Sequence, residues 1–124
     1  MLTALQLIIA LGIFNVWIIR ANKPTAYRGG TAQSMTEEFR VYGLSAEVCK
    51  IVGALKLALA ALLVVGIWVP TVAVWAASGM AFLMLVAVLM HFKVSDPVRK
   101  AVPALCMLAL SCMLALSLVV ALQH

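Results

Sequence analysis

The chain has 124 residues, of which 66% are hydrophobic and only 10% are charged, and its mean hydropathy is +1.17. A soluble domain of this size could not hide so much apolar surface from water, so a soluble fold is excluded and a lipid bilayer is the expected surroundings. The formal net charge is +5, but the basic residues are not gathered in one patch. A nucleic-acid partner is therefore not expected.

The first predicted element is an apolar run over residues 2–19. A signal peptide is also apolar and N-terminal, but this run has no basic segment before it and no small-residue cleavage site after it. The pattern therefore favours a membrane-spanning helix over a signal peptide.

The next segment, residues 20–45, is polar and is predicted to form a loop and then a short helix over 34–43. Ser34 and Glu37, three residues later, have the spacing of a capping box, in which each side chain accepts a backbone N–H. One face of this helix is apolar and comprises Met35, Phe39 and Tyr42. The charged residues Glu37, Glu38 and Arg40 are expected on the other faces, the two glutamates as capping and solvated groups. Such an amphipathic helix is predicted to lie at the membrane interface.

Three further apolar runs follow, over residues 46–68, 71–92 and 103–122. Each is long enough to cross a hydrocarbon core of roughly 30 Å as a helix. The runs are continuous and rich in Leu and Ala, whereas strands of a membrane barrel alternate over short segments. The predicted fold is an all-α integral membrane protein, a four-helix transmembrane bundle with a short interfacial helix, forming one domain over residues 1–124.

The basic residues indicate an orientation. Seven of the nine lie between the first and second spans or between the third and fourth: Arg20, Lys23, Arg28, Arg40, Lys93, Arg99 and Lys100. Because loops rich in Lys and Arg stay on the cytoplasmic side, both loops are expected in the cytoplasm and both termini outside. We expect a multi-pass protein of the bacterial plasma membrane.

The cysteines and methionines exclude some chemistry. Cys49, Cys106 and Cys112 form no Cys-x-x-Cys motif, which argues against an enzyme that generates disulfides with vicinal thiols. Met84 and His91 are seven residues apart on one helix face and could contribute to a copper site, but methionine among many leucines more often packs than binds metal. No metal site is predicted, and no catalytic residues can be assigned.

Lys56 is the clearest candidate for function, because a lysine at the centre of a span costs on the order of 3 kcal/mol. Neither Glu47 nor Lys50 on the same helix faces it, so its partner must come from another helix or from a bound molecule. The candidate ligand-binding residues, which are expected to line a polar cavity open to the cytoplasm, are Lys56, His91, Asn15, Glu47, Lys50 and Tyr42. An internal hydrogen bond or ion pair that fixes helix register explains Lys56 equally well.

Five sequence motifs resemble the DoxX-like family of small four-span membrane proteins: NKPTAYRGG (22–30), EEF (37–39), YGL (42–44), VGALKLALA (52–60) and MHFKVSDP (90–97). The spacing of Gly53, Lys56, His91, Asp96 and Pro97 is the most specific part. The resemblance extends more distantly to the DoxD subunit of thiosulfate:quinone oxidoreductase and to the receptor-assembly chaperone NACHO. Relatives often carry Glu at the place of Lys56.

The resemblance implies several roles. The leading hypothesis is an accessory or ligand-binding membrane subunit whose cavity binds a small amphipathic molecule, with a quinone as the candidate cofactor. A membrane or cytoplasmic redox protein would then be its partner, and the protein could also form a homo-oligomer. The alternative is an assembly factor or scaffold that uses the surface around Phe39, and an oxidoreductase in its own right is the third.

Overall fold

The computed structural model describes residues 2–23, 25 and 27–123, so Pro24 and Ala26 of the predicted loop lie outside the described residues. The helices follow in the order α1 (Leu2–Phe14), η1 (Asn15–Ile19), α2 (Met35–Val41), α3 (Ala46–Val65), α4 (Pro70–Lys93) and α5 (Val98–Leu122). Four helical segments are long and apolar enough to cross a membrane: Leu2–Ile19, Ala46–Val65, Pro70–Lys93 and Val98–Leu122. The predicted all-α class with four transmembrane helices is confirmed.

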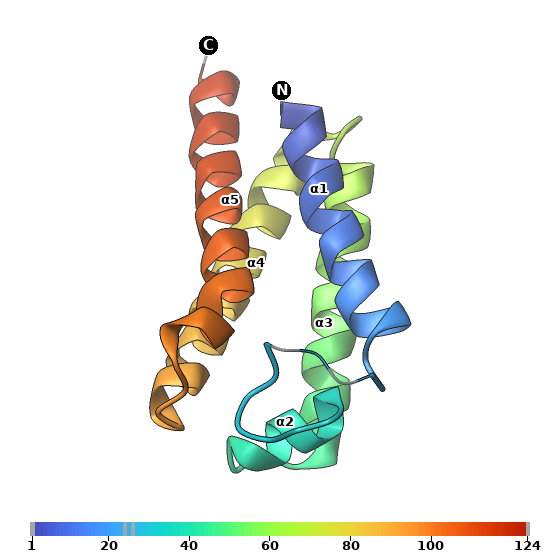
Figure 1. Ribbon diagram of the computed structural model, residues 1–124. Helices are drawn as coiled ribbons and strands as arrows, with labels where there is room; N and C mark the ends of the chain where they lie inside the picture. Colours follow the sequence, from blue (N-terminus) through green and yellow to red (C-terminus); the bar gives the residue numbers. More distant parts are fainter. Residues whose placement is uncertain (1, 24, 26, 124) are drawn as a thin grey trace.

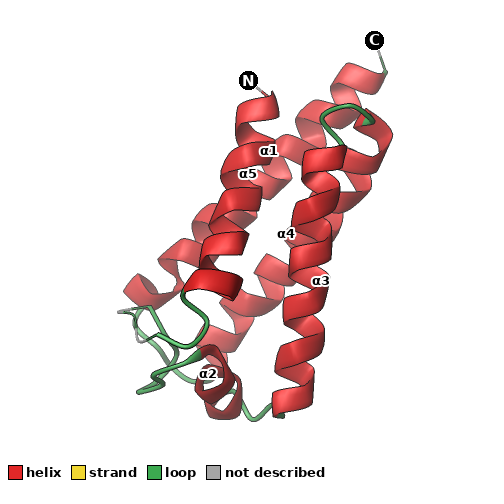
Figure 2. Ribbon diagram, turned by 90° about the vertical axis from the view of Figure 1, so that its right-hand side faces the viewer, coloured by secondary structure: helices red, strands yellow, loops and turns green. Residues whose placement is uncertain are grey.

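The long helices form a bundle with two distinct ends (Figure 1). The N-terminus, the C-terminus and the α3–α4 connection lie at one end, and the segment 20–45 with α2 lies at the other. Figure 2 shows the loops around α2 gathered at that same end. We call it the loop end, defined by residues 20–45 and the α4–α5 turn at 94–97.

Two helix bounds differ from the predicted spans, namely the end of the second and the start of the fourth, because a helix begins or ends where the backbone turns and not where hydropathy changes. The second span ends at Val65 rather than at residue 68, because Gly66 caps α3 and the chain turns there. The fourth begins at Val98, five residues before residue 103, and continues through Pro103. Pro103 is the sixth residue of α5 and has no N–H to donate, so one helical hydrogen bond is missing although the helix continues. Residues 98–102 are thus part of α5.

The core of the bundle lies towards the end that carries the termini. Its fully buried side chains come from all four long helices and include Ile9, Leu63, Met80 and Leu114. Gln6 is also buried there, and its side-chain amide donates to the carbonyl of Leu63 at 3.0 Å. The buried charged side chains lie nearer the loop end: Arg28, Glu38, Lys56 and His91.

Candidate functional site

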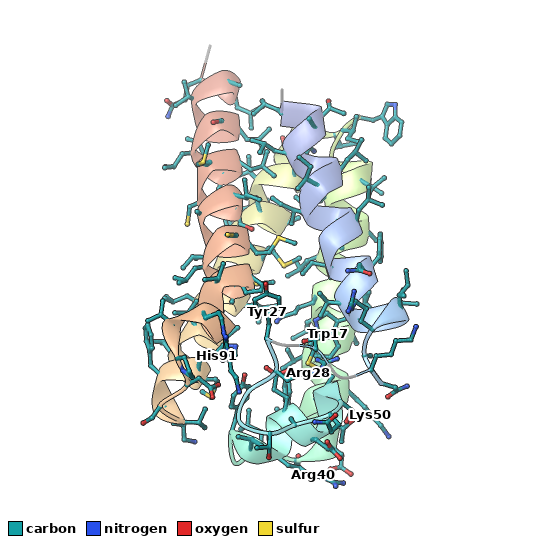
Figure 3. All side chains as sticks on the ribbon, viewed as in Figure 1. Trp17, Tyr27, Arg28, Arg40, Lys50 and His91 are labelled. Carbon is teal, nitrogen blue, oxygen red and sulfur yellow. The ribbon has the colours of Figure 1, made fainter. Side chains whose placement is uncertain are left out.

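An ion pair between Arg28 and Glu38 organises the loop end. The two side chains are buried, with 3.2 Å between Nη1 of Arg28 and Oε2 of Glu38. Arg28 also donates to backbone carbonyls just beyond the first span, at Arg20, Ala21 and Lys23. One guanidinium therefore holds the start of the loop against α2, which draws α2 beneath the bundle (Figure 3).

Glu38 corrects the prediction of a capping and solvated pair of glutamates. Ser34 caps α2, since its Oγ accepts the N–H of Glu37 at 3.2 Å, and the exposed Glu37 carboxylate accepts the N–H of Gln33 just before the helix. Glu38 is only 7% exposed. On a helix it shares the face of Met35 and Tyr42, at i+3 and i−4, and this face is turned into the protein. The pairing with Arg28 makes that burial tolerable.

A chain of side-chain contacts runs from Glu38 to the α4–α5 turn. The hydroxyl of Tyr42 donates to Oε1 of Glu38 at 2.6 Å and lies 3.4 Å from Nε2 of His91. Nδ1 of His91 lies 2.8 Å from Oδ2 of Asp96. Burial, followed by the Glu38 carboxylate, raises the pKa of Tyr42, so the phenol keeps its proton and acts as the donor.

The end of α4 brings His91 and Asp96 together. Ser95 has a left-handed backbone conformation with φ of 58°, and the N–H of Asp96 donates to the carbonyl of His91 at 3.0 Å. This is the hydrogen-bond pattern of a Schellman helix end. It folds the Asp96 carboxylate back towards His91, and Oδ1 accepts the N–H of Gly30 at 3.0 Å. Asp96 therefore joins the loop to α4 and does not cap α5.

Asp96 gives the fold a predicted dependence on acid. Burial opposes its ionisation, but the Gly30 N–H, His91 and Lys100 outweigh burial and hold the pKa of Asp96 below its ordinary value of 3.8. Ionised Asp96 therefore stabilises the fold at neutral pH, and this contribution is lost as the pH falls below 3.8 through the lower folded pKa.

Asp96→Asn should lower the melting temperature near pH 7 and flatten the decline of the melting temperature in acid. Melting curves in detergent at several pH values test this, with the exposed Glu47→Gln as control; an unchanged decline in Asp96→Asn contradicts it.

Lys56 lies over an aromatic ring rather than beside a carboxylate. Its Nζ is 5.4 Å from the ring centroid of Trp17, a cation–π distance. Trp17 belongs to the π-helix η1, which ends the first span. A Cβ on Gly53 would lie 2.7 Å from the Trp17 ring, so glycine at 53 leaves the space in which that ring sits. Gly53 and η1 together place the indole beneath the ammonium group.

A cavity of about 740 Å³ joins these features. It lies between α1, α4, α5 and the loop end. Its apolar wall is formed by Ile8, Gly12, Ile13, Met84, Met107 and Leu110. Its polar end is formed by Arg28, Glu38, Tyr42, Lys56 and His91. Figure 3 shows Tyr27, Arg28 and His91 gathered at this end of the molecule. Such a cavity, apolar with a few convergent polar groups, has the character of a small-molecule site.

Comparison with known proteins agrees with the sequence motifs. A model of the DoxX-like family matches residues 27–114, well over half of the chain. The chain belongs to the DoxX-like family. No curated protein and no solved structure matches it.

Four of the six candidate residues in this DoxX-like protein line the cavity: Lys56, His91, Asn15 and Tyr42. Lys56, His91 and Tyr42 are buried, whereas Asn15 is exposed. Glu47 and Lys50 are exposed and do not line it, and Figure 3 shows Lys50 on the side of the bundle away from His91. They precede Lys56 by nine and six residues and do not share its helix face.

Sequence reasoning missed the roles of Trp17, Arg28 and Glu38 in this family member. The burial of Glu38 could have been predicted, because its spacing from Met35 and Tyr42 places it on the apolar face of α2. Arg28 was used only as one of the basic loop residues that indicate the orientation of the protein in the membrane. Trp17 gave no usable signal, because its position depends on the extra residue in the π-helical turn and on Gly53 in another helix.

Proposed function

We propose that this DoxX-like membrane protein is an accessory subunit that binds a small amphipathic molecule in the cavity between α1 and α5. The observation that carries the proposal is the cavity itself, apolar along the helices and polar where it meets Lys56 and His91. An apolar tail would lie along Met107 and Leu110, and a polar head would contact Lys56.

The position of the cavity supports entry from the bilayer. Lining residues on α1 and α5 are exposed on the outside of the bundle, among them Ile8 and Cys106. Lipid surrounds these helices if they span the membrane, so a ligand dissolved in the bilayer would reach the cavity between them without crossing water. By the positive-inside bias, the loop end and the polar head would face the cytoplasm.

The size of the cavity supports a ligand of moderate mass. Its volume of about 740 Å³ falls within the range of roughly 300–1,000 Å³ typical of small-molecule sites. A quinone fits this class, because a ring carbonyl would accept a hydrogen bond from Nζ of Lys56 while its chain lies along the apolar wall. The assembly-factor alternative has less support, since Phe39, its expected contact surface, is only 8% exposed.

Filling the cavity should remove the ligand. Ala104 lines the cavity from α5, so Ala104→Phe is expected to occupy the space of the apolar tail. Native mass spectrometry of protein released gently from detergent should show a discrete small-molecule adduct on the wild type and lose it in the variant.

The matched control is Leu116→Phe, which adds a comparable ring on the outer face of the same helix, where Leu116 is 69% exposed. This variant should keep the adduct. A wild-type protein with a bare mass, or an adduct that survives Ala104→Phe, would rule out ligand binding in this cavity.

A further inference from the structure

The charges along the cavity are unbalanced. Four side chains that are cationic at neutral pH line it, namely Arg20, Arg28, Lys56 and Lys100, against the single carboxylate of Glu38. A neutral molecule would leave this excess of positive charge in place. The excess of positive charge therefore favours a ligand with an anionic head group.

Two of these cations are paired with a carboxylate, and a third is exposed to water. Arg28 pairs with Glu38 at 3.2 Å. Lys100 lies 4.0 Å from the Asp96 carboxylate and donates to the carbonyl of Gly30. Arg20 is exposed, so water can solvate it.

Lys56 is the buried cation that has no counter-charge among the described residues. It is 8% exposed, and it forms no ion pair and no hydrogen bond with any residue in the part of the chain that the structure describes. The Trp17 ring attracts the ammonium group but accepts none of its three protons in a conventional hydrogen bond. Because a charge within a span is costly unless it is paired, an anion beside Nζ would remove the cost.

We infer that the ligand of this cavity is an acidic single-chain amphiphile, a long-chain carboxylate, whose head group pairs with Lys56. The inference rests on the proposed function and names its ligand class. The carboxylate accepts hydrogen bonds from the ammonium group, and the hydrocarbon chain lies along Met84, Met107 and Leu110. A single buried cation without a counter-charge matches a monoanion; a phosphate monoester carries close to two negative charges near neutral pH, and its second charge would depend on the water-exposed Arg20.

The test compares an acid with its ester. Purified protein in a non-ionic detergent is titrated with palmitic acid and with methyl palmitate, which has the same chain and a neutral head, and the melting temperature is followed. Wild-type protein should be protected by the acid at concentrations about tenfold lower than by the ester, since a factor of ten corresponds to a modest difference in binding free energy.

Lys56→Met should abolish this preference and still be protected by the ester, because methionine keeps most of the length of the side chain and removes its charge. Lys50→Met is the matched control, since Lys50 lies on the same helix, is exposed and does not line this cavity. It should retain the preference for the acid.

A second measurement needs only the wild type and covers the case in which Lys56→Met does not fold. Palmitate labelled with ¹³C at its carboxyl group should titrate at lower pH when bound than in empty micelles, because Lys56 favours the anion. Equal protection by acid and ester, or an unshifted titration, would overturn the carboxylate while leaving amphiphile binding intact. Protection by neither compound, together with a bare native mass, would overturn the proposed function as well.

Discussion

Glu38→Ala is expected to lower the free energy of unfolding by about 3–5 kcal/mol, the usual cost of removing one partner of a buried ion pair. Arg28 would remain, 4% exposed, with an uncompensated charge. The N–H of Gly29 and the hydroxyl of Tyr42 would lose their acceptor as well. Unfolding in mixed detergent, followed by circular dichroism, measures the loss.

The neighbouring residue supplies the control for this prediction. Glu37 is adjacent to Glu38 in the sequence and is exposed. Glu37→Ala should therefore lower the free energy of unfolding by at most about 1 kcal/mol, the usual contribution of a capping interaction. Combining Glu38→Ala with Arg28→Met should restore part of the lost stability, because no unpaired charge is then buried. An equal loss in the two alanine variants would show that the Arg28–Glu38 pair does not organise the loop end.

Gly66→Ala is expected to destabilise the α3–α4 connection by about 1–3 kcal/mol, the usual cost of overpacking. A Cβ at Gly66 would lie 2.8 Å from Cα and 2.9 Å from N of Ala73. These are backbone atoms of α4, so they cannot rotate away as a side chain could. The same unfolding assay in detergent measures the effect.

Gly79→Ala is the matched comparison for that site. A Cβ there would meet only the end of the Leu59 side chain, at 3.3 Å, and alanine in a helix is favoured over glycine by up to about 1 kcal/mol. The variant should therefore be neutral or slightly more stable. If both substitutions had the same effect, close contact with the Ala73 backbone would not explain why position 66 is glycine.

The candidate site could be predicted in part. Lys56 was identified because a charge within an apolar run is costly wherever the rest of the protein lies. Tyr42 and His91 were predicted to line the same polar cavity as Lys56. Glu47 and Lys50 were grouped with them by depth alone, and depth does not determine on which side of the bundle a side chain lies.

The pairings within the site could not be predicted from local patterns. Arg28 and Glu38 are ten residues apart and meet because the loop folds back on α2. His91 and Asp96 are close in sequence, yet their contact requires the left-handed Ser95 and the fold of the α4–α5 turn. Each contact depends on backbone geometry that a hydropathy profile does not record.

The sequence by itself determined the membrane environment, the four long helices and the short capped helix between the first two. These depend on interactions between near neighbours: apolar runs of sufficient length, and the Ser34–Glu37 cap. Only the tertiary structure decided that α2 folds beneath the bundle and that Trp17, rather than a carboxylate, lies beside Lys56. The physical reason is that burial of a charge is set by what surrounds it in space, and those surroundings come from helices and loops far apart along the chain.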